Sequence, residues 1–267
     1  MRLHRVAAIF LRQFYLVRGS PARVLPLLGW VTIDMVLWGF MSRYLNSVTA
    51  ARFNFVPGLL GAVLLWDFFG RIMLGVTTAF FEDVWSRNFL NFFATPLSVS
   101  EYLAGLIFSS IASSSVGLGA MLVLAAVVFG LWFFAYGAVM IPFLLVLFLF
   151  GIALGVFATA LVLWLGPAAE WFVWPIPAML SPFAAVFYPL SALPRWMQYI
   201  SHILPPAYVF ENLRAIVGGR GPSAIALAIS VALAAGYIVM AAWFFARIYR
   251  RVVRTGLIAR YSAETLG

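Results

Sequence analysis

The sequence predicts an all-α integral membrane protein with six transmembrane helices, and three observations predict that fold class. Of the 267 residues, 65% are apolar and only 9% are charged. No water-soluble core could bury that much apolar surface, so lipid is the expected solvent for most of the chain. Apolar segments long enough to cross a bilayer recur along the sequence, and arginines gather at one side of them. We therefore expect a single transmembrane domain that covers residues 1–267.

Composition also excludes several kinds of site. The chain has no cysteine and two histidines, which rules out disulfides, thiolate metal sites and a histidine-rich metal cluster. All 17 basic residues are arginine, so a phosphate-binding loop of the type G-x-x-x-x-G-K-[ST] is impossible. The net charge of +9 need not indicate nucleic acid, because arginine on one side of a membrane protein sets its topology. We predict no metal, no cofactor and no nucleic-acid partner.

The first 23 residues are expected to form an interfacial helix that lies in the headgroup layer. Residues 2–18 carry one apolar stripe, formed by Leu3, Val6, Phe10, Phe14 and Val17. A cleaved signal peptide would have a continuous apolar run, whereas arginines interrupt the run here. Gly19-Ser20-Pro21 then turns the chain into the first span.

Five apolar segments are long enough to cross the membrane without interruption. They run from Val24 to Met41, Phe55 to Phe81, Tyr102 to Phe129, Ala138 to Leu165 and Ser223 to Phe245. Small residues in two of them favour close helix packing. These are the run Ser109–Ser115 in the third segment, and Gly151 and Gly155 in the fourth.

Residues 170–190 form a sixth segment that is long enough to span but cannot be a regular helix. It contains Pro175, Pro177, Pro182 and Pro189, so it is expected to be broken, with its freed backbone groups bound by protein or water. Residues 191–221 then give two short amphipathic pieces separated by Pro205-Pro206. We expect these pieces to dip into the outer leaflet and return, as a re-entrant helical hairpin.

A polar stretch, EDVWSRNFLNFFATPLSVSE, separates the second and third spans and covers residues 82–101. Helical spacing places Val84, Asn88, Asn91 and Thr95 on one face. A second, aromatic face holds Trp85, Phe89, Phe92 and Phe93. The stretch therefore predicts a short amphipathic helix that lies flat at the membrane surface and ends before Pro96. A solvated linker is the alternative interpretation.

The distribution of arginine predicts the orientation. With the N-terminus inside, the cytoplasmic side holds eleven arginines: Arg2, Arg5, Arg12, Arg18, Arg23, Arg87, Arg247, Arg250, Arg251, Arg254 and Arg260. The outer side holds five: Arg43, Arg52, Arg195, Arg214 and Arg220. This asymmetry favours an even number of spans with both termini in the cytoplasm.

Two segments resemble a known family. The block LNFFATPLSVSEY, residues 90–102, resembles the L-x-x-L-x-A-T-P-L-S-x-x-E-Y stretch of ABC-transporter permeases of the type-2 exporter (ABC-2 type) family. Residues 187–214, FYPLSALPRWMQYISHILPPAYVFENLR, resemble that family's late F-Y-P-x-x-x-L-P core, double-proline turn and closing E-x-x-R. The order and spacing of the two segments extend the resemblance over nearly the whole chain. One departure precedes the first block, where acidic and glycine positions often seen in the family read Arg87-Asn88-Phe89.

The resemblance implies that the chain is the permease subunit of an ATP-driven exporter in a bacterial cytoplasmic (inner) membrane, and not itself an enzyme. Such permeases pair as dimers, here expected to be a homodimer, and recruit two copies of a separate ATPase that binds ATP and Mg. Substrates across the family include lipid-linked polysaccharides, drugs, pigments and other amphiphiles. The N-terminal interfacial helix would gate the cytoplasmic side.

The resemblance also implies roles for particular residues. The helix over 82–101 would be the coupling helix that docks on the ATPase, through Glu82, Asp83, Trp85, Arg87, Leu90, Phe92, Phe93, Thr95 and Pro96. The re-entrant hairpin would reach into the outer leaflet, with Tyr188, Pro189, Pro194, Trp196, Pro205, Pro206, Glu211 and Arg214 as its candidate residues.

Four charged residues are candidates for the translocation path: Asp34, Asp67, Arg71 and Glu170. Asp67 and Arg71 are four residues apart, with the acid first, so their side chains lie one turn apart on one helix face. A lone charge near the middle of the bilayer is costly, so the two are expected to face each other, a pore or a partner helix. The pair either helps to hold the path closed or only neutralises itself.

Two other functions remain open from the sequence. An intramembrane enzyme, such as a lipid-modifying one, would have to draw its catalytic groups from Asp34, Asp67, Glu170, His4 and His202, and no spaced carboxylate–histidine cluster is visible. A secondary transporter should show internal repeats with matched broken helices, whereas only one broken span is visible.

Overall fold

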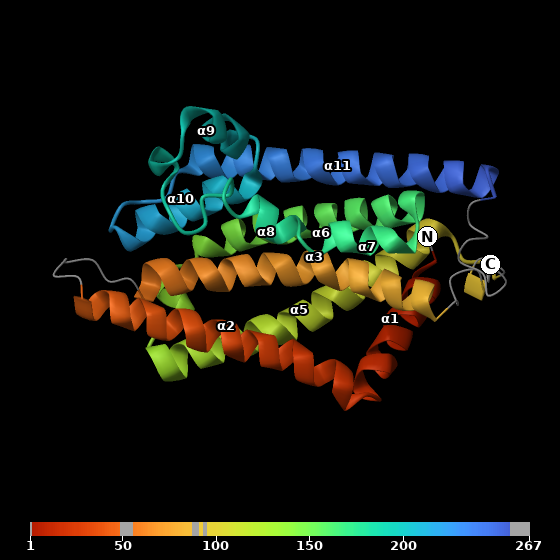
Figure 1. Cartoon of the computed structure of the whole chain (residues 1–267), viewed down its shortest axis with the longest axis horizontal. Coiled ribbons are helices and arrows are strands. Elements are labelled where there is room, and N and C mark those ends of the chain that lie inside the picture. Colours follow the sequence, from red (N-terminus) through yellow and green to blue (C-terminus); the bar gives the residue numbers. More distant parts are fainter. Residues whose placement is uncertain (1, 49–55, 87–90, 93–94, 257–267) are drawn as a thin grey trace.

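The computed structural model describes residues 2–48, 56–86, 91–92 and 95–256, and within these ranges the chain contains helices and no strand. Five long helices form the body of the molecule (Figure 1): α2 (Pro21–Val48), α3 (Gly61–Trp85), α5 (Val99–Phe129), α6 (Met140–Leu165) and α11 (Ala224–Arg254). The chain begins beside α1 (Leu3–Arg18), at the same end of the molecule as the last turns of α11. The short helices α9 (Arg195–His202) and α10 (Pro205–Val217) lie at the opposite end.

Four helices of the described chain are long and apolar enough to cross a membrane. They are Val56–Trp85, which joins the π-helical turn Val56–Leu60 to α3, then Val99–Phe129, Met140–Leu165 and Ala224–Arg254. The chain is thus an all-helical membrane protein with several spans, as predicted. The exact count of six spans stays a prediction.

Helix α3 is the centre of the packing. It lies between α5 and α6, and α11 covers the other side of α6. Its side chains Leu65, Phe69, Ile72 and Val76 are fully buried. Near the α10 end, the Tyr136 hydroxyl donates to the Pro57 carbonyl oxygen at 2.7 Å, and burial raises the pKa of this hydroxyl well above its ordinary value.

Small residues bring α5 and α6 close to α3, as the sequence predicted. A Cβ atom added at Gly155 of α6 would lie 2.8 Å from the Met73 carbonyl oxygen, closer than real Cβ atoms come. On the other side of α3, the Ser110 hydroxyl of α5 donates to the Ile72 carbonyl oxygen at 2.9 Å. The small-residue patterns therefore mark helix interfaces in this fold.

We expect Gly155→Ala to lower the unfolding temperature, with a loss of about 1–3 kcal/mol, because α6 must move away from the α3 backbone. The matched control is Gly119→Ala on α5, where nothing lies within 4 Å of the added Cβ atom. That change should be neutral or slightly stabilising, since alanine is the better helix former. Thermal unfolding of both variants in detergent checks the prediction, and equal unfolding temperatures would contradict it.

The proline-rich segment is broken, as predicted. It contains only the short helices α7 (Glu170–Val173) and α8 (Ile176–Leu180), followed by turns in which Ala185 has a φ of 53°. Side chains donate hydrogen bonds to carbonyl groups that have no helical partner in this segment. The Tyr188 hydroxyl donates to the Pro182 carbonyl oxygen at 2.8 Å, and Arg214 donates to the Val186 carbonyl oxygen at 3.3 Å.

Two helices are longer than the spans predicted within them. Helix α2 extends beyond both ends of the predicted first span, and α11 runs nine residues past Phe245 to Arg254. The polar stretch is not one separate helix over 82–101. Glu82–Trp85 belong to the last turn of α3, and Val99–Glu101 form the first turn of α5, whose N-terminus is closed by a capping box between Ser98 and Glu101. Between these helices, residues 87–90 and 93–94 lie outside the described residues.

Candidate functional site

A cavity of about 640 Å³ opens between α2, α3, α5 and the broken segment. One part of its wall is charged or polar, and another part is aromatic. The polar residues are Asp34, Asp67, Arg71, Thr78, Ser113 and Ser114, and the aromatic residues are Trp30, Trp66 and Trp174. The cavity therefore offers both hydrogen-bonding groups and broad apolar surfaces within the spanning helices.

The predicted Asp67–Arg71 pair forms and faces this cavity. Arg71 Nε lies 2.6 Å from Asp67 Oδ2, and the two side chains are 15% and 21% exposed. Asp34 reaches the same cavity from α2 and interacts electrostatically with both members of the pair. The structure thus brings together three of the four residues predicted for the translocation path.

A buried hydroxyl adds a polar group to the cavity wall. Ser114 is 2% exposed, and its Oγ atom has no hydrogen-bond partner within the described part of the chain. An unmet buried hydroxyl costs about 1–3 kcal/mol. Because Ser114 lines the cavity, a polar group inside the cavity could satisfy this hydroxyl.

Glu170, the fourth predicted residue, lies elsewhere. Its Oε2 atom accepts a hydrogen bond from Trp85 Nε1 at 3.1 Å, at the end of α3 and close to the surface. It does not line the cavity that holds Asp67 and Arg71. Glu170 opens α7, the first helix of the broken segment, so its position in the chain puts it at the α1 end of the molecule rather than at mid-span.

A second polar cluster joins α1, the end of α3 and the start of α5. Its centre is Asp83, which is fully buried. Arg12 Nη2 of α1 lies 2.6 Å from Asp83 Oδ1, and the Tyr102 hydroxyl of α5 donates to Asp83 Oδ2 at 2.7 Å. The last turn of α3 is therefore tied by one carboxylate to both neighbouring helices.

The polar stretch between α3 and α5 is attached to α1 by further contacts. Glu101 Oε1 accepts a hydrogen bond from the Arg2 backbone amide at 2.7 Å, and Glu101 Oε2 lies 3.3 Å from Arg5 Nη1. Arg5 also donates to the Pro96 carbonyl oxygen. The Phe92 ring lies 4.8 Å from the Arg12 guanidinium, a cation–π contact. These residues, with Asp83 and Tyr102, form what we call the α1 anchor.

A comparison with protein families gives a match over the part of the chain that holds both sites. The family model described as ABC-2 type transporter matches residues 5–217, from α1 through α10. The chain belongs to the ABC-2 type transporter family. No curated protein matches the chain. The matched range includes the cavity between α2, α3 and α5, and it includes the α1 anchor from Arg5 onward.

The α1 anchor changes the interpretation of the predicted coupling residues in this ABC-2 permease. Asp83 and Phe92 were expected at an exposed surface, but Asp83 is buried and Phe92 packs inward, 5.7 Å from the Tyr102 ring. The ion pair of Asp83 with Arg12 and the contacts of Phe92 with Arg12 and Tyr102 outweigh the amphipathic pattern here. Trp85, Thr95 and Pro96 are exposed, Glu82 is partly exposed, and Arg87, Leu90 and Phe93 lie outside the described residues.

At the opposite end of the permease, the family's E-x-x-R pair holds the last residues of the broken segment. Glu211 Oε1 accepts hydrogen bonds from the Leu190 backbone amide at 2.7 Å and from Arg214 Nη2 at 2.9 Å. Tyr188 and Pro189 directly precede Leu190. Pro205 and Pro206 occupy the first turn of α10, where their missing amide hydrogens cost nothing. Pro194 precedes α9, and Trp196 on α9 is exposed.

The prediction from sequence missed several residues of these sites. Arg12 and Tyr102 are separated from Asp83 by 71 and 19 positions, and no local spacing relates them. Two tryptophans of the cavity could have been found from the sequence, because each lies near an acidic residue. Trp66 adjoins Asp67, and Trp30 precedes Asp34 by four residues on α2. A tryptophan close to an acid within an apolar span is a pattern that could have indicated these cavity residues.

Proposed function

We propose that this ABC-2 chain is the permease subunit of an ATP-driven exporter, and that the cavity between α2, α3 and α5 is part of its translocation path. The observation that carries the proposal is the mixed wall of the cavity, with Asp34, Asp67 and Arg71 facing three tryptophans. Such a wall suits an amphiphile that presents a polar group and an apolar body, whether lipid-linked or drug-like. The substrate would leave the cytoplasm or the inner leaflet.

The α1 anchor supports a route for the coupling of ATP hydrolysis to this path. A separate ATPase subunit would bind ATP and Mg and dock at the polar stretch, where Trp85, Thr95 and Pro96 are exposed. Movement of that stretch would be passed to α1 and to the last turn of α3 through Arg5, Arg12 and Asp83. The complex would contain two permease copies, as a homodimer, and two ATPase copies.

We expect Ser113→Phe to abolish most of the transport, because its ring would fill the cavity. The matched control is Ser115→Phe, two residues further along α5, where the side chain is exposed and does not line the cavity. The permease is reconstituted in liposomes with its ATPase, and the ATP-dependent movement of a fluorescent amphiphilic dye is followed. Equal transport by the two variants, both inserted at the wild-type level, would contradict the proposal.

The proposed topology has six spans, formed by α2, α3, α5, α6, the broken segment and α11, with both termini in the cytoplasm of a bacterial cell. Residues 191–221, with α9 and α10, would then lie at the outer leaflet as the re-entrant hairpin. Arginine at the end of α11 and on α1 supports this orientation.

A thiol introduced at Arg220 on the cysteine-free chain tests this topology. Arg220 is exposed, directly after α10. We expect an impermeant thiol reagent to label Arg220→Cys from outside the cell and not to label Arg254→Cys, which stands at the far end of α11. The reverse pattern would invert the proposed orientation.

A further inference from the structure

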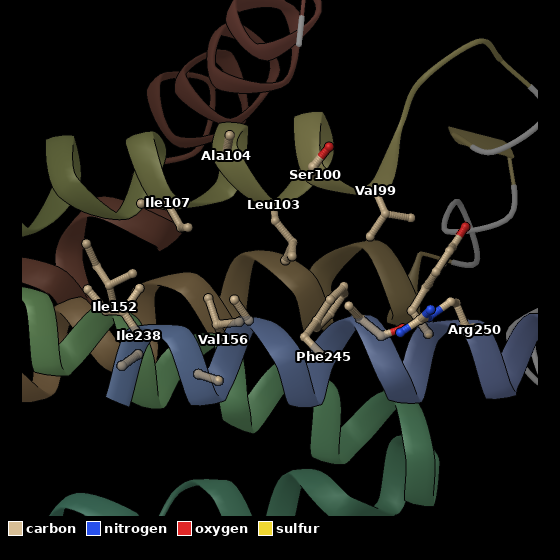
Figure 2. A pocket seen from close by; sticks show the side chains of 15 residues that line it. Val99, Ser100, Leu103, Ala104, Ile107, Ile152, Val156, Ile238, Phe245 and Arg250 are labelled. Atoms are coloured by element: carbon tan, nitrogen blue, oxygen red, sulfur yellow. The ribbon is translucent and has the colours of Figure 1, made fainter. Parts of the chain in front are cut away.

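A second cavity of about 550 Å³ lies apart from the proposed translocation path and shares no lining residue with it. Figure 2 shows this groove between α5 and α11, and side chains of α6 also line it. Its walls are apolar over most of their length, formed by side chains such as Leu103, Ile107, Val156 and Phe245. Polar groups occur at one end only, where Ser100, Tyr249 and Arg250 line the groove.

The length of the groove matches one leaflet of a bilayer. On α11 its lining extends from Ile238 to Arg250, which corresponds to about 18 Å of helix. One leaflet contributes half of a hydrocarbon core that is about 30 Å thick. Only 17% of the apolar stretch of α11, which forms one wall of the groove, is buried inside the molecule. Lipid is therefore the expected neighbour of this side of α11.

The polar end of the groove carries a positive charge that is available for a ligand. Arg250 Nε donates to the Ala246 carbonyl oxygen at 3.1 Å, and no acid pairs with Arg250 in the described part of the chain. The nearest acid on α5, Glu101, is held by Arg2 and Arg5 instead. Figure 2 shows Arg250 at the same end of the groove as Val99 and Ser100, beyond the apolar side chains.

We propose that this groove binds one anionic phospholipid, with an acyl chain between α5 and α11 and its phosphate at Arg250. The charge complements a phosphate, and the apolar length complements a chain of one leaflet. In the orientation proposed above, the lipid comes from the cytoplasmic leaflet; the site itself does not depend on transport. The lipid would fill the gap between α5 and α11 near the α1 anchor.

Native mass spectrometry of the full chain, purified in detergent, tests this site. Phosphatidylglycerol and phosphatidylcholine with identical acyl chains are the two probes. We expect one phosphatidylglycerol to be retained per chain, about tenfold more strongly than phosphatidylcholine, and Arg250→Gln to remove that preference. The matched control is Arg251→Gln, one position along on the exposed face of α11 and outside the groove, which should leave the preference unchanged. Ala242→Trp should displace both lipids by filling the groove.

Three outcomes would overturn the proposal. Equal loss of the preference in Arg250→Gln and Arg251→Gln would indicate diffuse attraction by the basic end of α11. Equal retention of both lipids by the wild type would exclude recognition of the phosphate charge. A disulfide-linked dimer of Ala242→Cys would place a second copy of the chain on this face. Unfolding temperatures of the variants, measured in parallel, show that each chain is folded, and none of these results depends on export activity.

Discussion

Replacement of Arg12 by alanine is expected to destabilise the permease by about 3–5 kcal/mol and to uncouple ATP hydrolysis from transport. The change removes the cation that lies 2.6 Å from the fully buried Asp83 and leaves that carboxylate, among the described residues, with only the Tyr102 hydroxyl as a partner. It also removes the guanidinium that faces the Phe92 ring. The last turn of α3 would lose its attachment to α1, and the polar stretch would lose its support.

Two further variants separate a structural effect from a coupling effect. Arg18→Ala, on an exposed part of the same helix, should leave stability and coupling unchanged. Arg12→Ala combined with Asp83→Asn removes both charges and should restore the protein level. If the α1 anchor transmits movement, this double variant still hydrolyses ATP without transport in the reconstituted complex. Recovery of wild-type transport together with the wild-type level would reduce the anchor to a purely structural role.

The second large effect is expected at the centre of the membrane. Arg71→Ala leaves Asp67 as a charged group inside the spanning helices, because its partner at 2.6 Å is lost. Such a charge costs on the order of 2.5–3.5 kcal/mol even on insertion scales, so the protein level should fall several-fold. Adding Asp67→Ala should restore the level, because both charges are then absent.

Transport by the restored Asp67→Ala/Arg71→Ala variant distinguishes the two interpretations of the pair. If the pair helps to hold the translocation path closed, the double variant hydrolyses ATP at a raised basal rate or leaks the dye, although it inserts normally. Asp34 faces the same cavity and would then be the remaining charge. Wild-type transport at wild-type level would show that the two side chains only neutralise each other.

Local features of the fold could be predicted from the sequence because they depend on neighbouring residues. The proline-rich segment is broken after Val173 and again after Leu180, as its prolines require. Gly19 and Ser20 separate α1 from α2, as predicted. The Asp67–Arg71 pair also formed as expected, since a spacing of four residues on a helix fixes the relative position of two side chains.

Other features could not be predicted because they depend on packing between distant segments. The direction of the Phe92 ring is set by Arg12 and Tyr102, which only the folded chain brings near it. Glu170 was grouped with Asp67 by charge alone, although the start of the broken segment lies beside Trp85. The predicted last span ends with the apolar run at Phe245, whereas the helix itself continues to Arg254. Arginine is in fact a good helix former, and nothing after Phe245 breaks the helix before Thr255.

The length of α11 has a consequence for the membranes that this permease tolerates. Its apolar part, from Ala224 to Phe245, measures about 33 Å, close to the thickness of an ordinary hydrocarbon core. The remaining turns carry Arg247, Arg250, Arg251 and Arg254 and extend the helix by about 14 Å. A thicker bilayer would draw these arginines toward the hydrocarbon, and a thinner one would expose apolar side chains to water or tilt the helix. Hydrophobic mismatch at this helix therefore makes bilayers much thicker or thinner than about 33 Å less favourable for the permease.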